Sequence, residues 1–386
     1  MFIMEYNDVI HGIINIPNHI HNIIQTPHFQ RLKKIKQLGL ACKTLPQANN
    51  NRFEHCIGTY YLADKTIDAL EKNTKDLMIP DFYRKVVTIA ALLHDIGHGP
   101  FSHTWEYICC EKYHHEENAC AFIDAIFEIC PIDWSEDRAY AIELIKALIV
   151  GDHKFLRDKK YRFLFDIVNN KNCDVDVDKW DYLQRDYFYT SQIQTPEVHL
   201  DFEDVFLKAR VSDDRSRIEY RYCDFRKIYN IFDVRTKFHI HIYRRPINIC
   251  MEKILKYVMT LCEDDLQRIN GLKITDIRSQ DVEAFLKLND DEVWKSLKRI
   301  KEPEEIVQLI NCLDNVGLYQ IHPETDDEKR SIADHMRAEI QIPNAGESFK
   351  SENIIFYGNA AEKPTFEQEK GFHQSVTYYK MISVST

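Results

Sequence analysis

Apolar residues recur at helical spacing along most of the chain between residues 17 and 265. Asn51 is a typical helix-capping residue, and the helix that it predicts keeps its apolar side chains on one face: Ile57, Tyr60, Tyr61, Ile67 and Leu70. The stretch DFYRKVVTIAALLHDIG over 81–97 carries a continuous apolar run, which predicts a buried helix that closes at Gly97. The pattern therefore favours a mainly α-helical core over residues 1–265.

The pattern changes beyond residue 265. A short helical stretch near 279–313 is followed by the acidic segment HPETDDEKR, and then by NIIFYG and SVTYYKMISV, which both predict strands. We expect a small α+β C-terminal lobe over residues 266–386, with a loop over 322–351. The expected fold class is mainly α, with this small lobe attached.

Composition narrows the classes of protein to consider. With 386 residues, of which 44% are hydrophobic, the chain can bury a large core. The formal net charge of -11 disfavours general binding to nucleic acid or to anionic lipid. Eleven cysteines without a paired CxxC framework indicate reduced thiols in a cytoplasmic or nuclear protein. The longest apolar run, VVTIAALL over 86–93, is too short to span a bilayer, so we expect a soluble protein with no membrane partner.

The segment HDIGHGPFSH over 94–103 contains three histidines and one aspartate. His94 and Asp95 are adjacent at the predicted end of a helix, about 100° apart around its axis, so both can face one point beyond the last turn. An imidazole and a carboxylate suit a divalent transition metal such as Fe, Zn or Mn better than calcium or magnesium. His55 and Asp178 are candidates to complete an N2O2 ligand set. Taken alone, each is more simply explained as a core histidine and a helix cap, respectively.

Three further histidines, His98, His103 and His115, are candidates for proton transfer, because imidazole titrates near neutral pH. A solvent-facing position is the ordinary alternative for each of them. Their place beside the proposed metal ligands favours the chemical role.

Arg235, His239 and Tyr243 are spaced by four residues and share a predicted helix face with apolar side chains. An arginine within an apolar stripe indicates that it meets an anion, either a phosphate or an internal carboxylate. Arg52 and Lys179 each lie within three residues of a proposed metal ligand. Metal ligands with convergent cations describe a site for a phosphate ester.

Asp178, Tyr182 and Asp186 repeat at the same spacing within DVDVDKWDYLQRD, which places two carboxylates and a phenol on one helix face. Such a face can bind a sugar, because Asp186 can accept a hydrogen bond from a hydroxyl group. Asp181, in contrast, is expected to be a solvated acid on an amphipathic helix.

The order His…His-Asp…Asp is similar to that of the HD-domain metal-dependent phosphohydrolases. The surrounding segments are more specific and resemble the catalytic core of the sterile-alpha-motif/HD-domain deoxynucleoside triphosphate triphosphohydrolases: NDVIHG, TPHFQRLKKIKQLG, NRFEHCIGTYYLA, LLHDIGHGPFSH, DVDKWDY and VRTKFHIHIY. The similarity runs in one order over residues 5–250. It implies an HD-domain helical core that cleaves a dNTP substrate to a deoxynucleoside and inorganic triphosphate.

The resemblance also implies roles for individual residues. The metal ligands would be His55, His94, Asp95 and Asp178. The residues acting around the scissile phosphate would be His98, His103, His115 and Glu106, the last in place of an aspartate in the family. The substrate-binding residues would be Gln37, Leu38, Arg52, Lys179, Tyr182, Asp186, Arg235, His239, Tyr243 and Arg244.

Within the substrate-binding group, the resemblance implies that three cations clamp the phosphates, as Arg52, Lys179 and Arg235. Gln37 and Asp186 would bind the 3′-hydroxyl, and Tyr243 would exclude a 2′-hydroxyl. Arg244 stands where the family has a glutamine near the base. Mg²⁺ on the substrate phosphates is a further candidate cation.

Members of the family are assembled into tetramers by guanine nucleotide and dNTP in allosteric sites, so the resemblance implies a homo-oligomer, either a dimer or a tetramer. This chain departs from the family at those sites. Gln25 replaces an aspartate that reads guanine, Lys33 replaces an arginine, and Met4 replaces a lysine. Regulation by guanine nucleotide is therefore not expected to be of the family's kind.

Two other functions stay open on the residues alone. One is hydrolysis of a different nucleotide by the same type of site. The other is a non-catalytic nucleotide sensor or nucleic-acid-binding oligomer, which is disfavoured because binding alone would not require every ligand and histidine.

Overall fold

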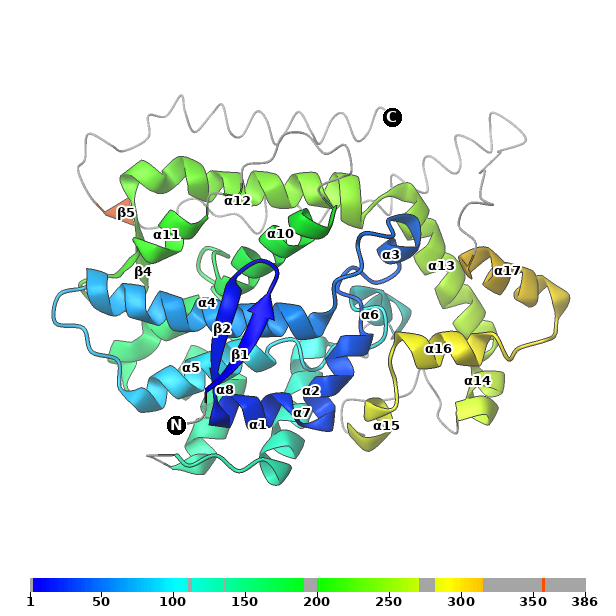
Figure 1. Cartoon of the computed structure of the whole chain (residues 1–386), viewed down its shortest axis with the longest axis horizontal. Coiled ribbons are helices and arrows are strands. Elements are labelled where there is room, and N and C mark those ends of the chain that lie inside the picture. Colours follow the sequence, from blue (N-terminus) through cyan, green and yellow to red (C-terminus); the bar gives the residue numbers. More distant parts are fainter. Residues whose placement is uncertain are drawn as a thin grey trace.

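The computed structural model describes residues 3–109, 113–134, 137–190, 200, 202–270, 282–314 and 356–357. Its architecture is mainly α-helical, as the sequence predicts (Figure 1). The helices are α1 (Asn18–Ile24), α2 (Pro27–Gln30), α3 (Ala41–Thr44), α4 (Arg52–Asn73), α5 (Asp81–Leu93), α6 (His103–Cys109), α7 (His115–Ile129), α8 (Arg138–Val150), α9 (Phe165–Val168), α10 (Val177–Thr190), α11 (Glu203–Leu207), α12 (Phe225–Phe238), α13 (Pro246–Leu261), α14 (Glu263–Asn270), α15 (Val282–Leu286), α16 (Asp290–Leu297) and α17 (Glu304–Asp314). The strands are β1 (Ile3–Asp8), β2 (Gly12–Pro17), β3 (Arg210–Val211), β4 (Ile218–Arg221) and β5 (Phe356–Tyr357).

Helix α4 is the centre of the fold, and it begins where the sequence predicts. The side chain of Asn51 accepts a hydrogen bond from the backbone N–H of Glu54, which satisfies one of the free donors of the first turn. Helix α5 packs along α4, and α10 lies between α4 and α12 (Figure 1). A Cβ atom at Gly58 would clash with Asp181, so the glycine allows α10 to approach α4 closely.

The buried helix predicted over 81–97 ends earlier than expected. Helix α5 stops at Leu93, and His94 is its C-terminal cap. The prediction that Gly97 closes the helix is therefore wrong. Gly97 is needed for another reason, because a Cβ atom there would clash with the backbone of α7 at His115 and Ala119. The early end frees residues 94–102 to form a loop at the centre of the molecule.

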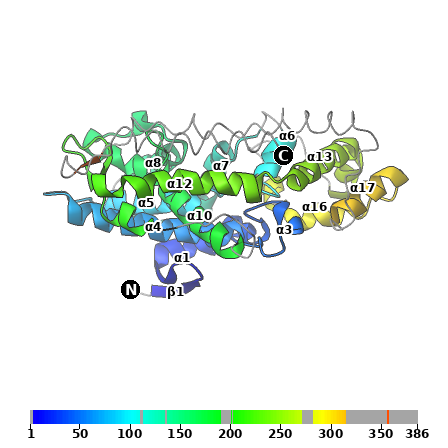
Figure 2. The same ribbon diagram turned by 90° about the horizontal axis from the view of Figure 1, so that it is seen from above.

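The first residues form an antiparallel hairpin that the helical pattern did not reveal. Strands β1 and β2 pair from Ile3 opposite Pro17 to Asp8 opposite Gly12. Gly12 has a φ of +72°, a conformation that glycine adopts without steric cost. The hairpin and α1 lie on one side of the helical layers (Figure 2).

Beyond residue 265, the residues that the structure describes form short helices, as predicted, and one strand. The stretch expected near 279–313 forms α15, α16 and α17. The strand expected at NIIFYG is present as β5, which pairs in parallel with β4 and so joins the small sheet of β3 and β4. The second expected strand, over 375–384, and the expected loop over 322–351 lie outside the described residues. The domain boundary at residue 265 stays a prediction.

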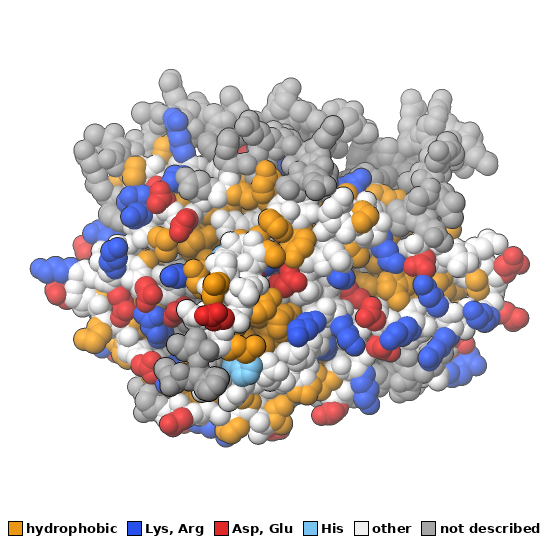
Figure 3. Space-filling model, in the orientation of Figure 1, with side chains coloured by type: hydrophobic (Ala, Val, Ile, Leu, Met, Phe, Trp, Pro, Cys, Tyr) orange, Lys and Arg blue, Asp and Glu red, His pale blue; other side chains and the backbone are white. Residues whose placement is uncertain are grey.

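The surface carries both kinds of charge. Figure 3 shows acidic and basic side chains interspersed over the face seen in Figure 1. Among the described residues, no helix is long and apolar enough to cross a membrane. The ten cysteines in the described ranges are all free thiols, as the sequence led us to expect.

Candidate active site

The four predicted metal ligands meet at one point. His55 lies in the first turn of α4, His94 and Asp95 follow α5, and Asp178 lies in the first turn of α10. The Nε2 atom of His55 is 3.0 Å from Oδ1 of Asp178 and 3.2 Å from Nε2 of His94. Oδ2 of Asp95 is 3.4 Å from the same His55 atom. Ligands about 2.1 Å from a tetrahedral metal ion lie about 3.4 Å from one another, so this spacing fits one shared cation.

The orientation of the two imidazoles also fits a metal ion. Nδ1 of His55 donates to Oδ2 of Asp181 at 2.8 Å, and Nδ1 of His94 donates to the carbonyl oxygen of Ala91 at 2.8 Å. Because Nδ1 is engaged in both rings, Nε2 is the atom that each ring would offer to a metal ion, and both Nε2 atoms face the carboxylates of Asp95 and Asp178. The donors present are therefore the two nitrogens and two carboxylates that a divalent transition metal accepts.

The electric field at this point favours a cation. Burial raises the pKa of Asp178, but its hydrogen bonds with His55 and His94 outweigh that effect and hold the pKa well below its usual range. Burial lowers the pKa of His55, while hydrogen bonds with Asp178 and Asp181 raise it to about 10. The raised pKa of His55 shows that the carboxylates favour positive charge here, and the lowered pKa of Asp178 shows that this carboxylate is ionised and available to a cation.

The three further histidines gather beside this cluster around Glu106. The Oε2 atom of Glu106 accepts from Nδ1 of His103 at 2.7 Å, and Oε1 accepts from Nδ1 of His115 at 2.6 Å. The rings of His98 and His115 stack with centroids 3.9 Å apart. Nε2 of His98 lies 3.2 Å from Oδ1 of Asp95, which joins the histidine group to the proposed metal ligands. The chain therefore presents one continuous array of titratable groups.

These histidines differ in environment. His98 is fully buried, and burial, followed by the nearby charge of Arg52, lowers its pKa well below the usual value. Burial also lowers the pKa of His115, but the hydrogen bond with Glu106 outweighs it and the net shift is upward. The side chain of His103 is 70% exposed, which makes it the most accessible of the three.

A cavity of about 580 Å³ opens onto this array. Every residue that the sequence analysis assigns to substrate binding lines it: Gln37, Leu38, Arg52, Lys179, Tyr182, Asp186, Arg235, His239, Tyr243 and Arg244. His94, Asp95, Asp178 and the three histidines line it as well, whereas His55 and Glu106 lie behind its wall. Arg235, His239 and Tyr243 line the same cavity, although α12 ends at Phe238. Residues His239–Tyr243 continue from this helix as a π-helical turn. Such turns occur frequently at functional sites.

The polar groups of the cavity are held by specific partners. Nη1 of Arg52 pairs with Asp95, and its Nε donates to Oγ of Ser102 at 3.0 Å. Nζ of Lys179 lies 2.8 Å from Oδ1 of Asp174. At the other side, Asp186 accepts from the hydroxyl of Tyr243 at 2.7 Å.

Asp186 is held further by Nδ2 of Asn50, which donates to it at 2.9 Å. Burial raises the pKa of Asp186 to about 6, although its hydrogen bonds with Tyr243 and Asn50 act in the opposite direction. The cavity thus contains both cations and a carboxylate that is hydrogen-bonded to a phenol.

Comparison with known proteins agrees with this arrangement. The sequence matches the HD domain family over residues 52–186, a span that contains all four proposed metal ligands. The chain therefore contains an HD domain over these residues. A SAMHD1 homolog of Dictyostelium discoideum, named a deoxynucleoside triphosphate triphosphohydrolase, is 33% identical over 344 residues, which are 86% of this chain and 63% of that protein. Human deoxynucleoside triphosphate triphosphohydrolase SAMHD1 is 32% identical over 335 residues, which are 79% of this chain and 53% of that protein.

A putative HD domain-containing protein of Acanthamoeba polyphaga mimivirus is 28% identical over 326 residues, covering 78% of this chain and 65% of that protein. The chain thus spans between about half and two thirds of the length of these relatives. The HD domain and the named relatives confirm the predicted family and support an enzyme of the hydrolase class. The predicted metal dependence agrees with the His55, His94 and Asp95 cluster, which could hold an ion.

Asp181 is the residue that the sequence analysis placed wrongly. It is fully buried rather than solvated, and it contacts His55, His11 and Arg185. Its spacing of three residues from Asp178 puts both carboxylates on one face of α10, and this signal could have revealed it. His11, Asn50 and Ser102, which also support the site, carry no comparable sequence signal.

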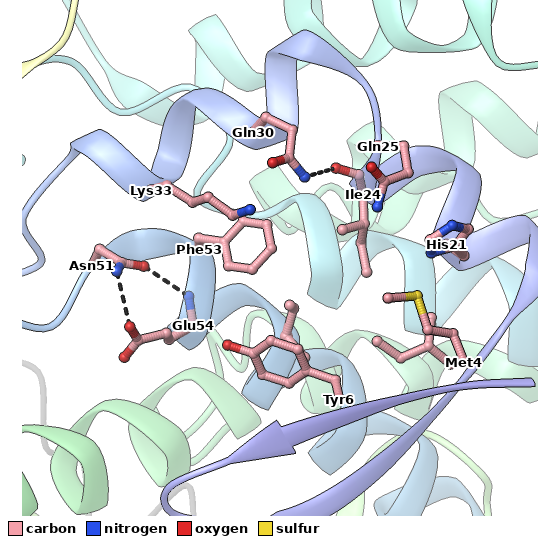
Figure 4. Close-up of a pocket in the computed structure, with 12 residues that line it drawn as sticks. Met4, Tyr6, His21, Ile24, Gln25, Gln30, Lys33, Asn51, Phe53 and Glu54 are labelled. Atoms are coloured by element: carbon pink, nitrogen blue, oxygen red, sulfur yellow. Dashed lines mark hydrogen bonds between the residues drawn. The ribbon is translucent and has the colours of Figure 1, made fainter.

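A second cavity of about 470 Å³ lies between the hairpin and the start of α4 (Figure 4). Met4, Gln25 and Lys33, where the chain departs from the family's activator sites, all line it. Nζ of Lys33 lies 4.6 Å from the centre of the Phe53 ring. The three departures noted in the sequence therefore belong to one place in the molecule.

Proposed function

We propose that this HD-domain protein is a metal-dependent triphosphohydrolase that cleaves a dNTP to a deoxynucleoside and inorganic triphosphate. The observation that carries the proposal is one cavity that is lined by three of the four candidate metal ligands, by three cations and by the Asp186–Tyr243 pair. The names of the relatives from Dictyostelium and human support the same substrate class.

The chain's own residues account for binding of the polyphosphate. Arg52, Lys179 and Arg235 line one cavity and supply the positive charge that three phosphates require. Burial lowers the pKa of Lys179, but the neighbouring Asp176 and other acidic groups raise it overall, so the ammonium group is charged at neutral pH. A divalent transition metal held by His55, His94, Asp95 and Asp178 would supply Lewis-acid activation of water and of a phosphoryl oxygen.

The sugar would lie against Asp186 and Tyr243. The carboxylate of Asp186 can accept a hydrogen bond from a 3′-hydroxyl, with Gln37 on the same cavity wall. The ring of Tyr243 is fixed by its hydrogen bond to Asp186, so it occupies space that a 2′-hydroxyl would need. This arrangement favours deoxyribonucleotides over ribonucleotides.

Cleavage of the ester requires a proton on the leaving 5′-oxygen, and His103 is suited to supply it. Glu106 holds Nδ1 of His103, which leaves Nε2 as the atom that can pass a proton to the substrate. The side chain of His103 lines the cavity and is more exposed than that of His98 or His115. His115 shares Glu106 and would keep that carboxylate in place.

The test is to incubate the purified full chain, with Mn²⁺ or Fe²⁺, with each of the four dNTPs and to separate the products by chromatography. Equal amounts of deoxynucleoside and triphosphate are expected, and the H94A variant should release neither. Release of a deoxynucleoside monophosphate with pyrophosphate would contradict the proposal, as would no turnover of any dNTP.

A further inference from the structure

A buried carboxylate behind the proposed metal site joins elements that are distant in the sequence. Asp181 is fully buried, and each of its oxygens accepts two hydrogen bonds. Oδ2 accepts from Nδ1 of His55 at 2.8 Å and from Nε of Arg185 at 2.9 Å. Oδ1 accepts from Nε2 of His11 at 2.7 Å and from Nη2 of Arg185 at 2.9 Å. All four lone-pair positions of this carboxylate are therefore occupied by hydrogen bonds, and none is left for another partner.

The contact with His55 determines which nitrogen of that ring carries the proton. A carboxylate only accepts hydrogen bonds, so Nδ1 of His55 must be the donor, and Nε2 is the atom whose lone pair a metal ion would use. That lone pair faces Asp178 and His94, which are the other candidate ligands. Asp181 therefore fixes both the tautomer and the rotation of a proposed ligand without lining the cavity itself.

The N-terminal hairpin completes this support. Oδ1 of Asp8, the last residue of β1, accepts from the backbone N–H groups of Ile10 and His11 at 2.8 and 2.9 Å, which fixes the turn. Oδ2 of Asp8 lies 3.0 Å from Nη2 of Arg185. The turn is thus attached to Asp181 twice, directly through His11 and indirectly through Arg185.

The same hairpin forms a wall of the second cavity. Met4 and Tyr6 of β1 and Ile16 of β2 line that cavity (Figure 4), while the turn between the two strands reaches Asp181. One short element thus contacts both the second cavity and the residues behind the proposed metal site.

We propose that Asp181 is a positioning residue of the metal site, and that the hairpin turn takes part in metal binding through His11. The inference rests on the proposed function, because it assumes that His55 is a metal ligand. It adds that the affinity for metal depends on a residue of the hairpin that touches neither the substrate cavity nor the ion.

The experiment is a titration of Co²⁺ into the metal-free full chain, followed by the visible absorption of the bound ion, which reports its affinity and its ligand geometry. The H11A variant should bind Co²⁺ about tenfold more weakly, and D181N about ten- to a hundredfold more weakly, as is typical when a partner of a ligating histidine is lost. The V9A variant changes an exposed side chain of the same turn and should match the unmodified protein. The H11Q variant, whose amide can still donate to Asp181, should recover most of the loss.

The outcomes separate this inference from the function on which it rests. Equal Co²⁺ affinities for H11A and V9A, with unchanged spectra, would overturn the role of the hairpin, and this comparison holds even if D181N does not fold. Failure of the unmodified chain to bind Co²⁺ would instead overturn the metal site, and with it the proposed function.

Discussion

His94 offers a single atom to the candidate metal site, so its substitution tests that site with the least effect on other contacts. Its Nδ1 is engaged by the carbonyl oxygen of Ala91, so only Nε2 is available to a metal ion. Asp95 is less suitable, because its removal would also leave Arg52 without its carboxylate partner.

We predict that H94A loses stoichiometric metal and dNTP turnover together, because one of only four protein ligands is gone. The measurement is metal content by elemental analysis alongside product release. H153A removes a histidine outside the site, which stacks on Phe165, and should retain both properties. Full metal content with full turnover in H94A would rule out its assignment as a ligand.

Tyr243 combines two effects that substitutions can separate. Its hydroxyl donates to Asp186, and its ring occupies the cavity wall. We predict that Y243A narrows the ratio of dATP to ATP hydrolysis, because space for a 2′-hydroxyl opens. Y243F keeps the ring and should largely keep the ratio. Steady-state kcat/KM on both nucleotides checks this, and equal rates on dATP and ATP in the unmodified protein would refute the steric argument.

At this scale, the sequence could predict residues whose chemistry is evident from their type and spacing. His94 and Asp95 are adjacent, and Asp178, Tyr182 and Asp186 share a helix face, so their convergence followed from helix geometry. The burial of Asp181 depends instead on how closely α10 approaches α4 at Gly58. The spacing of three residues from Asp178 indicates the helix face on which Asp181 lies, but the distance between the two helices is a property of their packing, and no pattern within either helix specifies it.

Helix α16 shows how a distant element can support the loop over 94–102, which carries the candidate residues His94, Asp95 and His98. Its first residue, Asp290, accepts from the backbone N–H of Phe101 at 2.7 Å and from that of Lys36 at 3.0 Å. Just before the helix, the carbonyl oxygen of Leu288 accepts from Arg31, which also donates to the carbonyl oxygen of His98. Phe101 and Ser102 have positive φ values of 60° and 56°, so the loop needs such external support.

Asp290 should make stability depend on pH. Burial raises its pKa to about 7, against the effect of the two backbone hydrogen bonds, whereas the unfolded chain has an ordinary carboxyl group near 3.8. A carboxyl group whose pKa is raised by folding stabilises the protein fully below the unfolded value, and this contribution is lost as pH rises through the folded value.

We therefore predict that, as the pH rises from 5 to 8, the free energy of unfolding falls further in the unmodified protein than in D290N. The upper limit over this pH range is roughly 2.6 kcal/mol, because only the part of the pKa shift that lies above pH 5 contributes within it. Denaturant unfolding at several pH values measures it. D291N removes an exposed neighbouring acid whose charge adds only slightly to the raised pKa of Asp290, so it should reduce the pH slope far less than D290N does. A D290N slope identical to that of the unmodified protein would contradict the prediction.

Element types were more predictable than element ends. The cap at Asn51 placed the start of α4, since capping is local chemistry. The end of α5 was misplaced because Gly97, which resembles a helix terminator, is required for contact with α7 instead. The hairpin was missed because β1 and β2 are each six residues long and alternate only weakly.

Over the whole molecule, the net charge of -11 does not describe the charge that a ligand meets. The substrate cavity is lined by Arg52, Lys179, Arg235 and Arg244, and acidic and basic groups are mixed on the face shown in Figure 3. Polyphosphate binding is thus compatible with an acidic chain. Oligomeric state is a different matter, because in the family it depends on nucleotides bound away from the active site, and the chain is altered there.

In the second cavity, Gln25 offers a neutral, exposed amide where the family has a carboxylate for the guanine N1 and N2 hydrogens (Figure 4). A charge-assisted contact of that type contributes roughly 1.5–3 kcal/mol, or about ten- to a hundredfold in affinity. Lys33 keeps the positive charge but lacks the two-pronged geometry of arginine, and its ammonium group lies over Phe53. Both changes should weaken the binding of GTP to this cavity.

We predict that GTP does not switch this enzyme on, so that dATP hydrolysis is either constitutive or responds to another nucleotide. The measurement is dATP hydrolysis titrated with GTP while the mass of the assembly is followed by light scattering. The Q25D variant restores the carboxylate, and Q25D combined with K33R restores the arginine as well. Activation of dATP hydrolysis by GTP should therefore be stronger in Q25D than in the unmodified protein, and strongest in the double variant. Strong activation of the unmodified protein by micromolar GTP, with formation of tetramers, would show that the carboxylate is not needed, because guanine would then be recognised by other groups of the cavity.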